Sequence, residues 1–192
     1  MFYLVMGLVF FLGIHTLRMV ADDWRSAKVA AFGLMTWKGI YAAVSLAGLA
    51  LIILGFGVAR ETSVELWHPA AWSRHAAGLL TLVAFALVVA SYVPSSRIKG
   101  LVGHPMVAGL MVWSVGHLAS NGRLADLVLF GTLLAWAVVE FVSLRKRDKA
   151  DGVTREPGSW ANDIVTVIIA VVIWYIFALH LHYSLVGVAP FG

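Results

Sequence analysis

Long stretches without any charged side chain recur along the chain. Crossing a hydrocarbon core about 30 Å thick takes roughly 20 helical residues, so uncharged stretches of this length predict membrane-spanning helices. The stretches without Asp, Glu, Lys or Arg are residues 1–17, 39–59, 75–96, 100–122 and 164–192. A further candidate, 127–144, is apolar except for Glu140.

The pattern predicts an all-α fold, a polytopic transmembrane bundle of six helices. Asp, Gly and Pro residues mark the breaks between the helices, and the stretch 145–160 is predicted to be a polar cytoplasmic loop. No internal repeat is visible, so we expect a single transmembrane domain, 1–192. The helices are expected at about residues 2–20, 39–59, 75–93, 104–121, 124–144 and 163–188.

The composition supports a membrane protein and excludes several other classes. The 192-residue chain is 61% hydrophobic and 12% charged, whereas a soluble domain is about half apolar and about a quarter charged. The lipid bilayer is therefore the expected surrounding, and a soluble enzyme or a nucleic-acid-binding domain is excluded. The chain has no cysteine, which rules out disulfides, thiolate metal sites and iron–sulfur clusters.

The basic residues are unevenly divided between the two sides of the predicted bundle. The net charge is +4, and Lys and Arg collect in the cytoplasmic loops of membrane proteins. One side holds 11 of them: Arg18, Arg25, Lys28, Lys38, Arg97, Lys99, Arg145, Lys146, Arg147, Lys149 and Arg155. The other side holds Arg60, Arg74 and Arg123. This asymmetry predicts that both termini lie on the non-cytoplasmic side.

Histidine is the strong transition-metal ligand that this chain has in number, with seven copies. His15 lies in an apolar run with Arg18 three residues later, and residues three apart share a helix face. An imidazole on iron with a guanidinium near a propionate suits haem. An equally good interpretation is a packed histidine beside an arginine that extends to the lipid headgroups.

His104 and His117 share one predicted helix, but they cannot serve one pocket. Their 13-residue separation places them roughly 140° apart around the helix and ~20 Å apart along it. Trp113 lies one turn before His117, and Asn121 lies one turn after it. By depth in the membrane, His104 is a better partner for His15 than His117 is.

Other polar residues of the predicted helices and loops are each open to two interpretations. His68 and His182 lie near segment ends and are predicted to be amphipathic anchors rather than ligands. Glu140 is either an interfacial carboxylate or a buried proton or ligand site. The loop 145–160 either docks a soluble partner or is an ordinary solvated loop.

Several short motifs resemble NnrU family membrane proteins over about residues 2–145. The most specific motif is His104-Pro105, then Trp113, then His117-Leu118-Ala119-Ser120-Asn121-Gly122. The others are Phe11-Leu12-Gly13-Ile14-His15-Thr16-Leu17-Arg18, Leu66-Trp67-His68-Pro69 and Arg74-His75. The family takes its name from nitrite and nitric oxide reduction in denitrifying bacteria. It is related to zeta-carotene isomerase, a membrane protein that binds haem b and isomerises a cis double bond.

The resemblance implies haem b as the cofactor and His15 and His117 as the metal ligands. A haem with an inclined axis would close part of the difference in depth between these two histidines. His104 stays the alternative ligand that the spacing favours. The residues implied to bind the cofactor are His15, Arg18, Trp113, His117 and Asn121.

One position separates this chain from the isomerase relative. The relative has a cysteine three residues before the second histidine, where it is implicated in a redox-linked change of ligand. This chain has Ser114 there. A thiolate switch is therefore impossible, and the substitution argues against carotene isomerase activity.

Three functions are compatible with these residues. The favoured one is a haem b-binding protein of the bacterial inner membrane with a redox or sensing role in nitrite and nitric oxide metabolism, together with a membrane respiratory partner. The second is a membrane isomerase or oxidoreductase that acts on a lipophilic polyene or quinone. The third is a non-catalytic assembly or interaction subunit, in which histidines only tie helices together. Cation transport is less favoured, because no broken-helix repeat is present.

Overall fold

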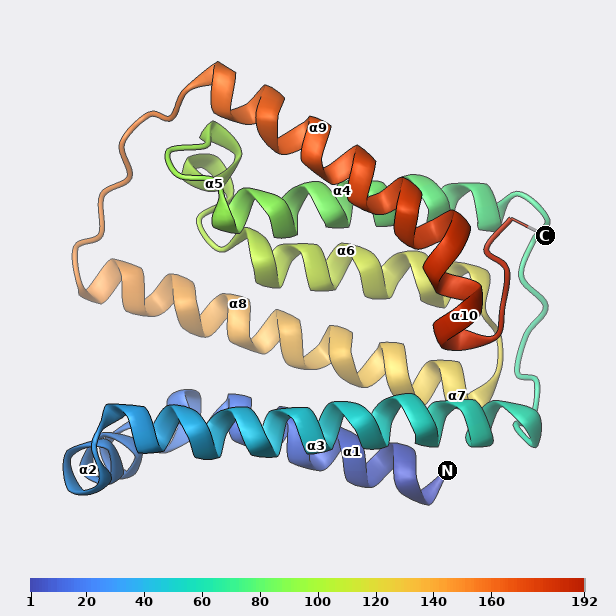
Figure 1. Cartoon of the computed structure of the whole chain (residues 1–192), viewed down its shortest axis with the longest axis horizontal. Helices are drawn as coiled ribbons and strands as arrows, with labels where there is room; N and C mark the ends of the chain where they lie inside the picture. Colours follow the sequence, from blue (N-terminus) through green and yellow to red (C-terminus); the bar gives the residue numbers. More distant parts are fainter. Residues whose placement is uncertain (192) are drawn as a thin grey trace. The chain divides into compact units, whose positions relative to one another are not determined.

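Helices joined by turns and short loops make up the fold. The computed structural model describes residues 1–191 and contains no β-strand among them (Figure 1), which confirms the all-α class. The contacts divide the chain into two compact units, Met1–Val64 and Glu65–Gly192, and the single transmembrane domain stays a prediction. The two units differ in their helices and in the polar residues that they carry.

The first unit is built on two long apolar helices. α1 (Phe2–Val20) packs along α3 (Leu34–Glu61), and the short α2 (Asp22–Phe32) connects them (Figure 1). Asp22 and Asp23 occupy the first turn of α2, where carboxylates interact favourably with the helix dipole. Gly33 ends α2 with a φ of 85°, a conformation that costs glycine least.

Glycines bring the backbones of α1 and α3 into contact. A methyl group on Gly48 would lie 2.7 Å from the backbone nitrogen of Phe11, and one on Gly7 would lie 2.6 Å from that of Ile52. On Gly55 it would overlap the backbone nitrogen of Leu4. Helices in lipid associate through such close packing, because the surrounding acyl chains are as apolar as the side chains.

The second unit contains the remaining helices (Figure 1). α4 (Ser73–Tyr92) packs extensively on α6 (Pro105–Ser120), with α9 (Trp160–Ile176) against α4 and α8 (Thr132–Ala150) against α6. α6 therefore has α4 and α8 as its packing partners. The shorter elements are α5 (Arg97–Val102), α7 (Leu124–Asp126), the π-helical segments η1 (Leu127–Gly131) and η2 (Phe177–Leu181), and α10 (His182–Val186).

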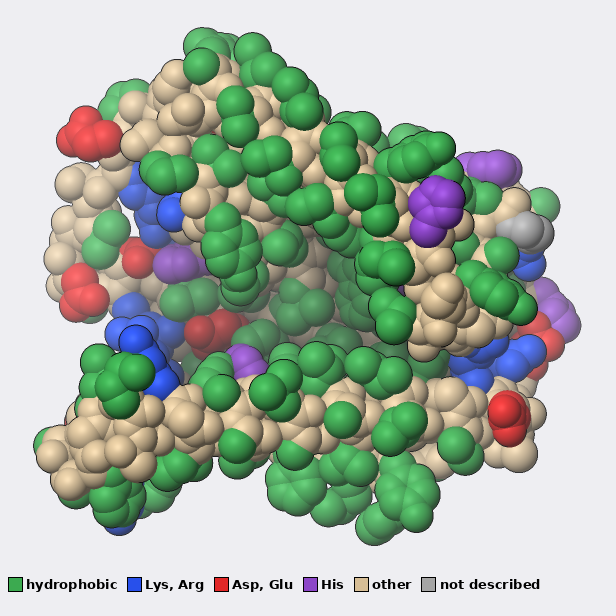
Figure 2. All heavy atoms as spheres, in the orientation of Figure 1, with side chains coloured by type: hydrophobic (Ala, Val, Ile, Leu, Met, Phe, Trp, Pro, Cys, Tyr) green, Lys and Arg blue, Asp and Glu red, His purple; other side chains and the backbone are tan. Residues whose placement is uncertain are grey.

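Among residues 1–191, five helical stretches are long and apolar enough to cross a membrane, by length and composition. They are Phe2–Val20, Leu34–Glu61, Ser73–Tyr92, Leu124–Ala150 and Trp160–Val186. Pro105–Ser120 is apolar but shorter, so the six-helix count and the side on which the termini lie stay predictions. Hydrophobic side chains cover much of the visible surface (Figure 2), as expected where lipid is the solvent.

Some helix boundaries differ from the predicted ones. α3 begins at Leu34 rather than near residue 39, and α8 continues to Ala150, so part of the predicted loop 145–160 is helical. Charge-free stretches measure how much of a helix can lie in hydrocarbon, whereas helical hydrogen bonding continues through charged residues into the headgroup region. After the loop, Ser159 caps α9 by accepting a hydrogen bond from the amide of Ala161.

The contact of α1 with α3 predicts opposite effects of two neighbouring substitutions. Gly55→Ala places a methyl group into the backbone of Leu4 and should lower the free energy of unfolding by about 1–3 kcal/mol. Gly57→Ala is the matched control, because nothing lies within 4 Å of the added methyl. It should leave stability unchanged or raise it slightly. Thermal unfolding in detergent, followed by intrinsic tryptophan fluorescence, measures both, and equal effects would contradict the packing.

Candidate functional site

The backbone of its own helix holds the imidazole of His15 in place. Nδ1 lies 2.6 Å from the carbonyl oxygen of Phe11, one turn earlier in α1. A carbonyl oxygen only accepts, so Nδ1 donates, and the neutral ring then has its lone pair on Nε2. The rings of Phe11 and Tyr41 lie near the imidazole, with centroid separations of 4.4 and 5.0 Å.

Arg18 lies in the last turn of α1, and its side chain is exposed. It follows His15 by three residues, so the two share one side of the helix. A helix end is where a guanidinium reaches the membrane interface at little cost. This placement is compatible with both interpretations of Arg18, a partner for a propionate or a contact with headgroups.

His117 repeats this geometry in the second unit. Its Nδ1 lies 2.9 Å from the carbonyl oxygen of Trp113, one turn earlier in α6, so Nε2 again has the lone pair of the neutral ring. Two aromatic rings flank the imidazole, that of Trp113 at 4.4 Å and that of Phe130 at 4.6 Å between centroids. Asn121 donates its amide to the carbonyl of His117 at 2.9 Å and so holds the end of α6.

Phe130 is a site residue that the sequence analysis missed. It belongs to the π-helical segment η1 and is 4% exposed. A π-helical turn contains more residues than an α-helical one, which changes the side that every later side chain faces, and such turns are frequent at functional sites. Periodicity of hydrophobic residues does not reveal an isolated π turn, so no sequence signal identified this contact.

Ser114, which stands where the isomerase relative has cysteine, is fully buried. Its hydroxyl has no hydrogen-bond partner within residues 1–191. A serine hydroxyl contains no sulfur and stays protonated at neutral pH. The thiolate chemistry expected of the cysteine therefore has no equivalent in this side chain.

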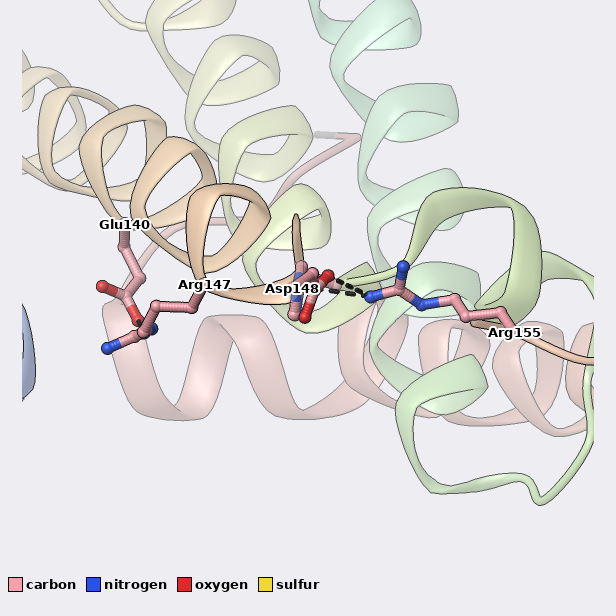
Figure 3. Close-up of polar contacts among 5 residues, drawn as sticks. Glu140, Arg147, Asp148 and Arg155 are labelled. Carbon is pink, nitrogen blue, oxygen red and sulfur yellow. Dashed lines mark hydrogen bonds and ion pairs between the residues drawn. The ribbon is translucent and has the colours of Figure 1, made fainter. Parts of the chain in front are cut away.

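His104 belongs to a different cluster, at the other end of α6. Its Nε2 lies 2.7 Å from Oδ2 of Asp148 in α8, and the same carboxylate accepts a hydrogen bond from Arg155. Figure 3 shows Asp148 and Arg155 directed toward each other. Binding of iron by Nε2 of His104 would compete with the Asp148 carboxylate, whereas Nε2 of His117 forms no such bond within the described part of the chain. His104 stays an alternative ligand, but one with a competing partner.

Glu140 forms an ion pair within α8. Its Oε1 accepts a hydrogen bond from Arg147 at 3.3 Å, and its side chain is only 13% exposed (Figure 3). The other oxygen, Oε2, is buried without a hydrogen-bond partner among the described residues. Of the two interpretations of Glu140, the buried carboxylate fits this geometry better than a carboxylate extended to the interface.

The two predicted ligands lie in separate units, His15 in Met1–Val64 and His117 in Glu65–Gly192. The structure places Trp113 and Asn121 beside His117. The pairing of His117 with His15 on one haem stays a prediction. Within the described chain, no group of three or more His, Asp or Glu side chains gathers to hold a metal ion. His68, by contrast, forms an exposed pair with Glu65 at 2.8 Å.

Asp148 is predicted to hold the loop after α8 through Arg155. Asp148→Asn removes the charge that attracts both Arg155 and His104, so amide hydrogens of residues 151–158 should exchange about two- to fivefold faster. Hydrogen-exchange mass spectrometry measures this effect. Asp151→Asn is the control, because Asp151 makes no ion pair within residues 1–191; unchanged exchange in Asp148→Asn would contradict the assignment.

The comparisons with known proteins agree with the motifs. The family model described as NnrU protein matches residues 3–190, a wider range than the motifs cover. Neither the curated proteins nor the solved structures gave a match. Because the family match extends over nearly the whole chain, this protein belongs to the NnrU family.

Proposed function

We propose that this protein binds haem b in the bacterial inner membrane and has a redox or sensing role in nitrite and nitric oxide metabolism. One observation supports it most: the imidazoles of His15 and His117 are each held by the backbone of their own apolar helix in the same way. Each donates Nδ1–H to the carbonyl four residues earlier. In metal-binding histidines, a hydrogen bond from the ring nitrogen that does not bind the metal fixes the tautomer and the direction of the ring.

A haem site needs little else from the protein. The porphyrin supplies four nitrogen ligands, so two histidines complete the coordination of the iron. The apolar helices would surround a macrocycle, and the Trp113 and Phe130 rings beside His117 offer flat apolar contacts. Arg18 would pair with a propionate near the membrane interface. When bound, haem b would supply an iron that changes oxidation state by one electron.

Family membership supports the wider part of the proposal. The match to the NnrU protein family covers nearly the whole chain, and the name of the family is the source of the link to nitrite and nitric oxide. The uneven distribution of Lys and Arg favours an orientation with both termini outside the cytoplasm. In that orientation, the cluster of His104, Asp148 and Arg155 faces the cytoplasm.

The proposal predicts a Soret absorbance band in detergent-purified protein after haem-replete expression. His15→Ala and His117→Ala should each abolish or strongly reduce the band, because each removes one iron ligand. His75→Ala is the matched control: it removes an exposed histidine from α4 and should leave the spectrum unchanged.

Three results would change this assignment. Absence of a Soret band in the native protein would reject haem binding. Loss of the band in His104→Ala but not in His117→Ala would move the second ligand to His104. An unchanged spectrum and unchanged function in both His15→Ala and His117→Ala would favour the third function, an assembly subunit with structural histidines.

A second candidate function is an enzyme that acts on a lipophilic polyene or quinone. The observation that favours it is the aromatic environment of His117, in which Trp113 and Phe130 contact the imidazole and also each other, at 5.0 Å between centroids. Conjugated molecules stack on such rings. The buried Ser114 in place of a cysteine argues against the redox-linked isomerase chemistry of the relative.

The enzyme hypothesis predicts a bound isoprenoid. An organic extract of the purified protein should contain a polyene or quinone at near-stoichiometric amount, and Trp113→Ala should reduce it by removing a stacking surface. Liquid chromatography with mass spectrometry makes the measurement, with Trp24→Ala in α2 as the control. An extract without isoprenoid, together with unchanged carotenoids and quinones in cells lacking the protein, would exclude this function.

A further inference from the structure

The end of α8 and the loop after it form a strongly basic surface that the proposed haem site does not use. An open cavity of about 600 Å³ lies there. Its polar lining consists of one carboxylate and four cationic side chains, from Asp148, Arg145, Lys146, Lys149 and Arg155. Lys and Arg side chains gather around this end of the second unit in Figure 2.

Two guanidinium groups approach each other above Gly103. A methyl group on Gly103 would lie 3.0 Å from the guanidinium carbon of Arg155 and 3.1 Å from Nη1 of Arg145. These arginines come from different segments, Arg145 from α8 and Arg155 from the loop that follows it. Gly103 also has a φ of 81°, so both its backbone conformation and its missing side chain make room for the two groups.

The positive charge of this cavity is not balanced by the protein. Asp148 is the carboxylate of the lining, and it already pairs with Arg155 and His104. Arg145, Lys146 and Lys149 form no ion pair within residues 1–191. Basic residues at a helix end interact favourably with the helix dipole, and they also orient a membrane protein. Neither effect requires two guanidinium groups to converge, because like charges repel at short distance.

We infer that this cavity binds a phosphate-bearing anion. Guanidinium groups bind phosphate oxygens through paired hydrogen bonds, and lysines add compact positive charges. Apart from Glu140, the helix carries no charged residue from Leu127 to Leu144, so the cavity begins where hydrocarbon gives way to headgroups. Phe141 and Val142 also line it, which provides an apolar side for the start of acyl chains. An anionic phospholipid is therefore the favoured source of the phosphate, with free phosphate as the alternative.

Native mass spectrometry of the full-length protein in detergent tests this site. The protein is titrated with cardiolipin, with phosphatidylglycerol, and with phosphatidylcholine as the zwitterionic comparison. A second arm titrates inorganic phosphate by calorimetry. Arg145→Gln/Lys149→Gln removes two cations without breaking an ion pair, and it should weaken binding of the anionic lipids about tenfold. Lys28→Gln/Lys38→Gln, in the first unit, removes the same charge elsewhere and should bind as the native protein does.

The outcomes distinguish a lipid phosphate from a free phosphate, and both from the absence of a specific anion site. Tight anionic-lipid binding that only the Arg145→Gln/Lys149→Gln variant loses supports the lipid. Saturable binding of inorganic phosphate that the same variant loses, without selective lipid binding, supports a soluble phosphate ligand. Two results would overturn the inference. One is an equal loss of binding in both double variants. The other is a native protein that binds anionic lipids no better than phosphatidylcholine and does not bind inorganic phosphate saturably. Thermal unfolding of both variants checks that each is folded, and the result is independent of haem.

Discussion

Close contact between helix backbones is the constraint on which the rest of this structure depends. In lipid, apolar side chains gain little by leaving their surroundings for one another, so helices associate where their backbones come close. Gly48 and Gly55 allow this between α1 and α3, and Gly109 allows it between α6 and α4, where a methyl group would lie 2.9 Å from the carbonyl of Ala84. These contacts decide which side of each helix faces its neighbour.

Polar side chains inside these apolar helices bond to the helix that carries them. His15, Thr16, His117 and Ser120 each reach a backbone carbonyl one turn earlier. Such a bond satisfies one polar atom within the helix itself, which lowers the cost of a polar group in a bilayer. For the two histidines it has a second effect, because it directs the other ring nitrogen away from the backbone.

The predicted fold was correct in class and in the existence of the long helices, since apolar stretches of spanning length depend on composition alone. Their ends were less predictable: α8 continues to Ala150 because charged residues can extend a helix into the headgroup region. Within the site, the sequence identified Trp113 and Asn121 beside His117 from their spacing of one turn. It did not identify Phe130, because a π turn leaves no periodic signal.

The sequence by itself determined that this is an all-helical membrane protein without cysteine chemistry, and that histidine is its main potential metal ligand. These properties follow from residue counts and from local spacing along a helix. Only the tertiary structure decided that Asp148 and Arg155 engage His104, and that Arg145 approaches Arg155 above Gly103. Such contacts join residues up to 52 positions apart, and their formation depends on how the helices pack, which no local pattern records.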